Sequence, residues 1–232
     1  MAKSDIVGAT AIADKGWFKA HKWLLLRRLS QLGILGLFLT GPVLGIWIVK
    51  GNLASSLTLD VLPLTDPHIL LQAMLSGVTP EAAALVGAAI VLAFYMLVGG
   101  RVYCSWVCPV NMVTDAAAWL RRKLGLRGAS HMSRSTRYWM LALTFILPLV
   151  TGSIVWELFN PVSMMFRGLV FGLGMAWILI LGIFLFDLLV SRDGWCGHLF
   201  PVGAFYSLLS TRAPLRVSAI NREACDDCMD CF

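Results

Sequence analysis

Four stretches of the 232-residue chain contain no Asp, Glu, Lys or Arg, and each is 19 to 21 residues long. They are Leu29–Val49, Ala82–Gly100, Tyr138–Trp156 and Gly168–Phe186. A helix needs about 20 apolar residues to cross the roughly 30 Å hydrocarbon layer of a membrane. The whole chain is 58% apolar and 14% charged, whereas soluble domains are about 25% charged. The sequence therefore predicts four transmembrane helices and excludes an ordinary cytosolic enzyme.

The basic residues indicate how the chain is oriented. Residues 1–28 carry six Lys or Arg, residues 101–137 carry seven, and the tail after Ser191 carries four, which leaves only Lys50 and Arg167 elsewhere. Loops rich in Lys and Arg stay in the cytoplasm. We therefore expect a multi-pass protein of the bacterial cytoplasmic (inner) membrane with both termini cytoplasmic. The net charge of +6 is explained by the basic residues of these cytoplasmic segments. We therefore expect membrane lipid as a partner and do not expect nucleic acid.

Two similar motifs follow the second and fourth stretches. Residues 103–110 read YCSWVCPV and residues 195–202 read WCGHLFPV, with their first cysteines and their prolines both 92 residues apart. Parallel internal repeats are a known membrane architecture. The predicted fold class is an all-α membrane protein with four transmembrane helices as two duplicated hairpins. We expect both motifs at the cytoplasmic membrane surface, facing each other.

The C-terminal tail contains a second kind of cysteine pattern. Cys225, Cys228 and Cys231 form C-x2-C-x2-C, which matches the first three ligands of a bacterial ferredoxin loop for a 4Fe–4S cluster. A zinc site and a reactive tail without a bound metal are the alternatives. The pattern would continue beyond Phe232, so we expect the natural product to run on. We divide the chain into a cytoplasmic N-terminal segment (1–28), a four-helix membrane domain (29–212) and the start of a truncated ferredoxin-type domain (213–232).

The cysteines of the paired motifs are candidate redox or cluster ligands. Cys104 and Cys108 are four residues apart, so both sulfurs would lie on one face of a helix. Cys196 is the counterpart of Cys104, whereas Phe200 stands where the pattern predicts a fourth cysteine. His198 could in principle replace that ligand. The alternative is that the cysteines only pack between helices, as small buried cysteines often do.

Three acidic residues are candidates for proton or quinol chemistry. Asp187 ends the fourth stretch, and an ionisable group next to hydrocarbon suggests function. Proton transfer coupled to quinol oxidation is one role, and pairing with Arg192 is the other. Glu157 is a similar candidate on the outer face. Asp66 and His68 lie on the outer connection where quinol protons would leave, although such loop residues are usually solvated.

Taken together, these motifs resemble those of the NapH-type family of ferredoxin-type membrane quinol dehydrogenase subunits, which serve the periplasmic nitrate reductase system. The resemblance covers essentially the whole chain and depends on residues 104–109, residues 195–198 and the loop that starts at Cys225. Related membrane ferredoxins, which act in nitrous oxide reductase maturation and in copper assembly of oxidases, share the paired motifs.

The resemblance implies a quinol-oxidising electron-transfer subunit with menaquinol or ubiquinol as substrate. It also implies two cytoplasmic 4Fe–4S clusters and a periplasmic iron–sulfur partner, followed by the cytochrome and catalytic subunits of the reductase. Cys104, Cys108 and Cys196 match the membrane motifs of the family, and the three tail cysteines match its first cluster loop. Phe200 departs from that pattern. The alternatives are a maturation or copper-assembly factor and a structural anchor for a soluble partner.

Overall fold

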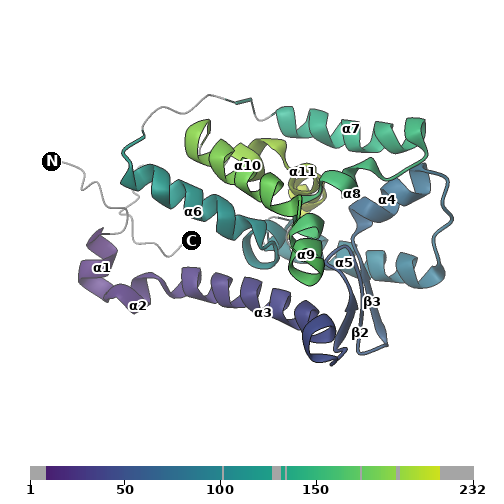
Figure 1. Ribbon diagram of the computed structural model, residues 1–232, viewed down its shortest axis with the longest axis horizontal. Coiled ribbons are helices and arrows are strands. Elements are labelled where there is room, and N and C mark those ends of the chain that lie inside the picture. The colour runs from purple at the N-terminus through teal and green to yellow at the C-terminus, as the bar shows by residue number, and fades with distance from the viewer. Residues whose placement is uncertain are drawn as a thin grey trace.

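A computed structural model describes residues 9–100, 102–126, 132–133, 135–172, 174–191 and 194–214. The elements, in chain order, are α1 (Ala9–Lys15), α2 (Trp17–Ala20), α3 (Lys22–Leu44), β1 (Val49–Gly51), β2 (Ser55–Thr58), β3 (Leu62–Thr65), α4 (Pro67–Leu75), α5 (Ala82–Val98), η1 (Tyr103–Val107), α6 (Val110–Lys123), α7 (Thr136–Thr151), α8 (Val155–Phe159), α9 (Pro161–Phe171), α10 (Ala176–Leu189), η2 (Trp195–Leu199), α11 (Pro201–Leu209) and η3 (Ser210–Arg212). Helices α3, α6 and α7 lie along the long axis, with α1 and α2 at one end and α4 and the strands at the other (Figure 1).

Helices form along all four charge-free stretches, but not always as continuous spans. Among the described residues, α3 is the one helix long and apolar enough to cross a membrane, and α5, α7, α9 and α10 are shorter apolar helices. The helix expected over Gly168–Phe186 is divided between α9 and α10, because Gly172 has a φ of 99°, outside the helical region. The stretch Tyr138–Trp156 is interrupted in the same way at Gly152, whose φ is 65°. The prediction of unbroken helices in these two stretches is wrong.

The outer connection after α3 contains a small antiparallel sheet with the strand order β1-β2-β3. Val49 pairs with Thr58, and Ser56 pairs with Leu64. The side chain of Asn52 accepts hydrogen bonds from two backbone N–H groups and stabilises the first turn. These strands have only three or four residues, and they are stable here because α5 packs against β3. The all-α fold class is therefore wrong for this segment, although the described chain is mostly helical.

The duplication in the sequence is also a duplication of backbone structure. η1 and η2 are both five-residue π-turns. The residue after each turn is extended, and the N–H groups of Cys108 and Phe200 each donate to the first carbonyl of the turn at 2.9 Å. Pro109 is the N-cap residue of α6 and Pro201 is the first residue of α11, and at both positions the missing N–H group costs no helical hydrogen bond. α3 contacts η1 and α7 contacts η2, so each turn lies against the first long helix of its own half.

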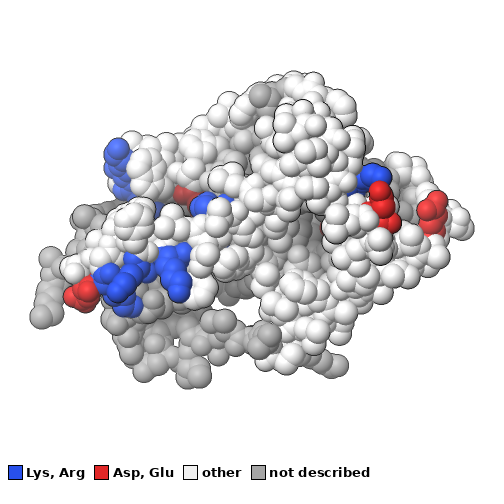
Figure 2. Space-filling model, turned by 90° about the horizontal axis from the view of Figure 1, so that it is seen from below, with Lys and Arg blue, Asp and Glu red and all other residues white. Residues whose placement is uncertain are grey.

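Charged side chains gather toward the two ends of the long axis. On the face seen from below, Lys, Arg, Asp and Glu lie near the end that holds α1 and α2 and near the end that holds the strands (Figure 2). The described surface between them on this face is uncharged (Figure 2). An uncharged centre on this face is expected if the middle of the bundle lies in hydrocarbon, where charged side chains are costly.

A close approach of α11 to the end of α5 leaves no room for a side chain at Gly100. A Cβ atom there would overlap the backbone carbonyl of Tyr206, whereas one at Gly182, inside α10, would meet nothing within 4 Å. We expect Gly100→Ala to lower the unfolding free energy by about 1–3 kcal/mol, the usual cost of overpacking. Thermal unfolding of the detergent-purified protein measures this, with Gly182→Ala as the control. Equal unfolding temperatures for the two variants would contradict this packing.

Candidate functional site

The two cysteine motifs meet inside the bundle in a reciprocal arrangement. A Cβ on Gly203, in α11, would lie 3.5 Å from the Sγ of Cys104. The Sγ of Cys196 lies 3.9 Å from the Oγ1 of Thr114, in α6. The first cysteine of each motif therefore faces the helix that follows the other motif. The expectation that the motifs face each other is confirmed.

Burial favours the protonated form of two thiols at this junction, those of Cys108 and Cys196. Burial, and to a smaller extent the neighbouring Cys104, raises the pKa of the Cys108 thiol to about 12. Burial also raises the pKa of Cys196 well above its usual range, and the nearby Cys108 and Cys104 raise it further. Because thiolates are the nucleophiles and the metal ligands, these cysteines are poor nucleophiles unless a metal or cluster replaces their protons.

The described residues do not supply a complete ligand set for a 4Fe–4S cluster at the paired motifs. Such a cluster is held by four thiolates, and the motifs offer Cys104, Cys108 and Cys196. Phe200 takes the backbone position that corresponds to Cys108 and is 3% exposed, with its ring centroid 5.9 Å from that of Trp156. In the part of the chain that the structure describes, no three His, Cys, Asp or Glu side chains are grouped to hold a metal ion.

His198, the other candidate ligand, lies within η2 and is partly exposed. Its Nδ1 atom is buried and has no hydrogen-bond partner among the described residues, and the same is true of the Nε1 atom of Trp195. The structure therefore places His198 on the second turn but does not bring it into a metal-binding group with the cysteines.

Asp187 is fully buried and its carboxylate supports the second motif. Its Oδ1 accepts the backbone N–H of Trp195, the first residue of η2, at 2.9 Å. The buried guanidinium of Arg121, in α6, donates to the carbonyls of Leu188 at 2.8 Å and of Asp187 at 3.4 Å. A carboxylate at the start of a helical turn satisfies N–H groups that have no partner within the turn. The predicted proton or quinol role of Asp187 remains a prediction.

The first motif is held by polar side chains of α3. The Nε2 of Gln31 donates to the carbonyl of Ser105 at 2.9 Å, and the Oγ of Ser30 donates to the carbonyl of Trp106 at 3.0 Å. These carbonyls lie at the end of a helical turn, where acceptors have no partner within the helix itself. Pro109 cannot supply one, because proline has no N–H group. Sequence reasoning missed Ser30 and Gln31, although two adjacent polar residues inside a charge-free stretch are a usable signal.

Asp66 lies in a buried polar cluster rather than on a solvated loop. Its Oδ1 accepts the backbone N–H of His68 and the hydroxyl of Tyr206, both at 2.9 Å. Asp66 is 9% exposed and His68 is 0% exposed, so the solvated alternative is wrong for both. Because Tyr206 belongs to α11, this hydrogen bond joins the outer connection of the first half to the helix that follows the second motif.

Burial governs the protonation of both groups. It raises the pKa of Asp66 to about 6, against the lowering effect of its hydrogen bonds from His68 and Tyr206, and the charge of Glu157 raises it slightly further. It lowers the pKa of His68 to about 3, so that the imidazole is neutral at physiological pH. A carboxyl group with a pKa near 6 is suited to general acid–base chemistry near neutrality.

The rest of the cluster comes from α4 and α7. The His68 ring contacts the Oγ1 of Thr144 and the Nε2 of Gln72, each at 3.2 Å. Gln72 is fully buried, and its Oε1 has no partner among the described residues. Sequence reasoning missed Gln72, Thr144 and Tyr206. His68 and Gln72, four residues apart on an otherwise apolar helix, are a signal for the first, whereas nothing in the sequence links Tyr206 to Asp66.

Three tyrosines connect this cluster to the cysteine motifs. The ring centroids of Tyr95 and Tyr206 are 4.5 Å apart, those of Tyr103 and Tyr206 are 5.6 Å apart, and those of Tyr95 and Tyr103 are 6.2 Å apart. Tyr103 is the first residue of η1, and the three rings and Cys108 belong to the same buried core. The cysteines and Asp66 therefore belong to one continuous buried region.

Glu157, the third acidic candidate, lies at the edge of this region. Its side chain is 19% exposed, accepts a hydrogen bond from the Nδ2 of Asn160 at 3.2 Å and lies 3.9 Å from the guanidinium of Arg167. The tail cysteines Cys225, Cys228 and Cys231 lie outside the described residues.

Comparison with known proteins identifies relatives of nearly the whole chain. A 4Fe–4S binding domain family matches residues 82–127 and 173–217, one match in each half. The methylamine utilization ferredoxin-type protein MauN is 52% identical in Methylorubrum extorquens and 55% identical in Paracoccus denitrificans, over 97% and 96% of this chain and 78% of each relative. The ferredoxin-type protein NapH of Escherichia coli is 49% identical over 97% of this chain and 78% of its own length. No solved structure matches.

The incomplete thiol set leads to a prediction about iron content. We expect Cys104→Ser and Cys108→Ser to leave iron and acid-labile sulfide unchanged in anaerobically purified protein, because the paired motifs lack a fourth thiolate. Cys225→Ser, in the ferredoxin-like loop, is the matched variant and should remove about four irons per chain. A loss of iron from Cys108→Ser as large as that from Cys225→Ser would show that the paired motifs hold a cluster.

Proposed function

Because the chain belongs to the family of ferredoxin-type proteins that includes NapH and MauN, we propose that it is a membrane subunit that oxidises quinol and passes the electrons through iron–sulfur centres to a periplasmic oxidoreductase. The observation that carries the proposal is the single buried region in which both cysteine motifs, three tyrosines and an ionisable Asp66 meet. A substrate that releases electrons and protons together needs a redox centre and a proton acceptor near each other.

The proposed location is the bacterial inner membrane, with four membrane-crossing segments and both termini in the cytoplasm. The long apolar α3 supports this placement, as do the shorter apolar helices and the uncharged band between charged ends (Figure 2). The basic residues of the N-terminal segment and of the loop before α7 support the orientation. In this orientation Asp66 and the small sheet belong to the periplasmic half.

The proposed electron acceptor is the periplasmic nitrate reductase system, reached through a periplasmic iron–sulfur subunit and then the cytochrome and catalytic subunits. The similarity to NapH supports it. A second candidate is a role in methylamine utilization, which the equally close MauN relatives favour. Maturation or copper assembly of a respiratory enzyme, which the shared motifs allow, is the third alternative.

The residues of the chain have distinct parts in the proposed reaction. A 4Fe–4S cluster, when bound, supplies one-electron chemistry, whereas quinol releases two electrons and two protons. The Asp66 carboxylate accepts a quinol proton on the periplasmic side as a general base. The Tyr206 hydroxyl donates a hydrogen bond to the Oδ1 of Asp66 and stabilises the ionised carboxylate. His68 is neutral and Gln72 carries no charge, so neither adds a charge to the polar cluster around Asp66.

The proposal is tested by mixing menaquinol and ubiquinol, in turn, with membranes that contain the full-length protein. We expect the electron paramagnetic resonance signal of reduced 4Fe–4S clusters to appear with at least one quinol and to be weaker in membranes that contain Cys225→Ser, which removes one cluster. Clusters that no quinol reduces would contradict quinol oxidation. Complementation separates the acceptors: rescue of nitrate respiration in a strain without NapH supports the first, and rescue of growth on methylamine in a strain without MauN supports the second.

The Asp66 carboxylate gives the reaction a predicted pH dependence. Because the ionised form is the base, the rate of quinol oxidation should rise with pH through about 6, the pKa of Asp66. Tyr206 lowers that pKa and Glu157 raises it. Tyr206→Phe should therefore move the midpoint to higher pH and Glu157→Gln should move it to lower pH. Asp66→Asn should lose the rise and slow the reaction about 10²-fold or more. A pH profile that is the same in all four proteins would contradict the assignment.

A further inference from the structure

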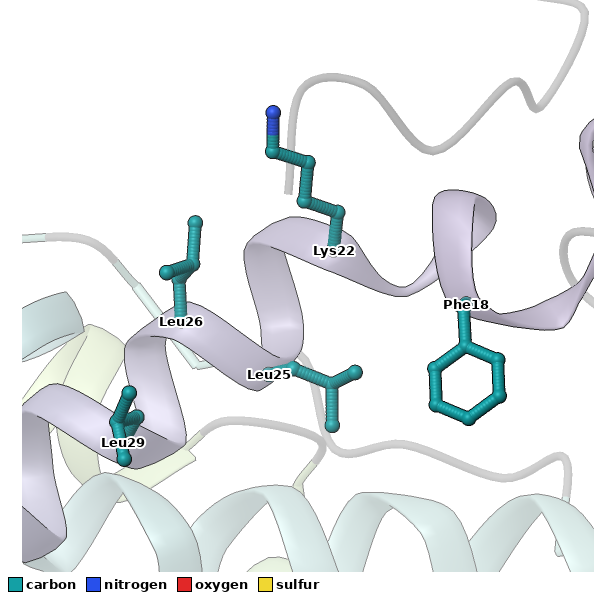
Figure 3. A pocket seen from close by; sticks show the side chains of 5 residues that line it. All are labelled: Phe18, Lys22, Leu25, Leu26 and Leu29. Carbon is teal, nitrogen blue, oxygen red and sulfur yellow. The ribbon is translucent and has the colours of Figure 1, made fainter.

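An open groove lies where the N-terminal segment meets the membrane domain. Phe18 of α2 and Lys22, Leu25, Leu26 and Leu29 of α3 line a volume of about 430 Å³. In Figure 3, Phe18 and Leu25 lie on one side of the chain, and the Lys22 side chain extends its amine away from them into open space. The walls of the groove are thus apolar, and Lys22, which also lines it, holds its amine away from Phe18 and Leu25.

The apolar walls of this groove are largely exposed. Phe18 is 77% exposed and Leu29 is 70% exposed. Only 17% of the most apolar part of α3 is buried within the described structure. Exposed apolar surface of this kind needs a cover, and lipid provides that cover for a helix that crosses a membrane.

The charges around the groove indicate which lipid fits. The segment that leads into it is basic, with Lys19 three residues before Lys22 and six Lys or Arg among residues 1–28. Trp17 and Trp23 are the sequence neighbours of Phe18 and Lys22, and tryptophan is enriched at the level of lipid headgroups. Basic pockets beside membrane helices on the cytoplasmic side bind anionic headgroups, and lysine is a common phosphate-binding residue.

We propose that this groove binds one anionic phospholipid of the cytoplasmic leaflet, with an acyl chain against Phe18, Leu25 and Leu29 and the phosphate beside Lys22. The site depends on the membrane orientation proposed above and is independent of quinol oxidation. A zwitterionic lipid fills the same apolar walls, but its net neutral headgroup gains less from the surrounding lysines.

The chain offers a matched control for the lysine. The Lys22 amine lies 5.4 Å from the ring centroid of Trp23, and the Lys123 amine lies 5.2 Å from that of Trp119. Both are interfacial lysines above a tryptophan ring, but only Lys22 lines the groove. Lys123→Gln therefore removes the same charge and the same kind of contact without altering the proposed site.

The test is a titration of the delipidated, detergent-purified protein with phosphatidylglycerol and, separately, with phosphatidylcholine. Bound lipid is counted by native mass spectrometry and the thermal unfolding temperature is followed in parallel. We expect phosphatidylglycerol to bind more tightly, and Lys22→Gln to weaken its binding about fivefold, as expected for about 1 kcal/mol per lysine at an anionic surface. Lys123→Gln should bind as the unaltered protein does. Leu29→Gln, at an exposed wall position, should weaken both lipids.

Equal effects of Lys22→Gln and Lys123→Gln, or equal affinity for the two lipids, would overturn the proposal. A failure of both lipids to bind would overturn it as well. Quinol-driven cluster reduction should persist in Lys22→Gln membranes. If quinol does not reduce the clusters of the unaltered protein, the proposed function is contradicted, whereas the measured lipid binding still tests the groove.

Discussion

The hydrogen bond between Tyr206 and Asp66 joins the two halves of the molecule. Asp66 begins α4 in the first half, and Tyr206 lies on α11, which follows the second cysteine motif. A carboxyl group in so apolar a bundle is stable only if it is protonated or receives hydrogen bonds, so α11 must lie against α4 for the buried Asp66 to be tolerated. The contact of the same helix with Gly100 then places η1 beside the second motif.

Local features of this structure could be predicted from the sequence. The repeat of Cys104 and Cys196 predicts a repeat of backbone, and both sites are π-turns that end before a proline. Each proline is followed directly by a helix, α6 after Pro109 and α11 from Pro201. The sequence predicts these features because a proline, or a repeated motif, determines the backbone conformation of the residues next to it. The sheet was missed because strands of three or four residues contribute little to an average over 20 residues.

Features that depend on distant partners could not be predicted. The burial of Asp66 is caused by Tyr206, 140 residues away, and by the packing of α4 against α7. The sequence shows Gln31 only as a polar residue in an apolar stretch, and its hydrogen bond to the carbonyl of Ser105, 74 residues away, explains why it is there. Phe200 was recognised as a departure from the motif, but that its ring packs against Trp156 required the structure.

The contacts between α3 and η1 couple the protein to its surroundings mechanically. Two side chains of α3 hold the carbonyls of the turn that carries Cys104, and Arg28 of the same helix pairs with Asp115 of α6. A tilt of α3 would therefore move η1, and Cys104 with it, in the same direction. Since η2 rests on α7 instead, bilayer thickness would act on the relative position of Cys104 and Cys196.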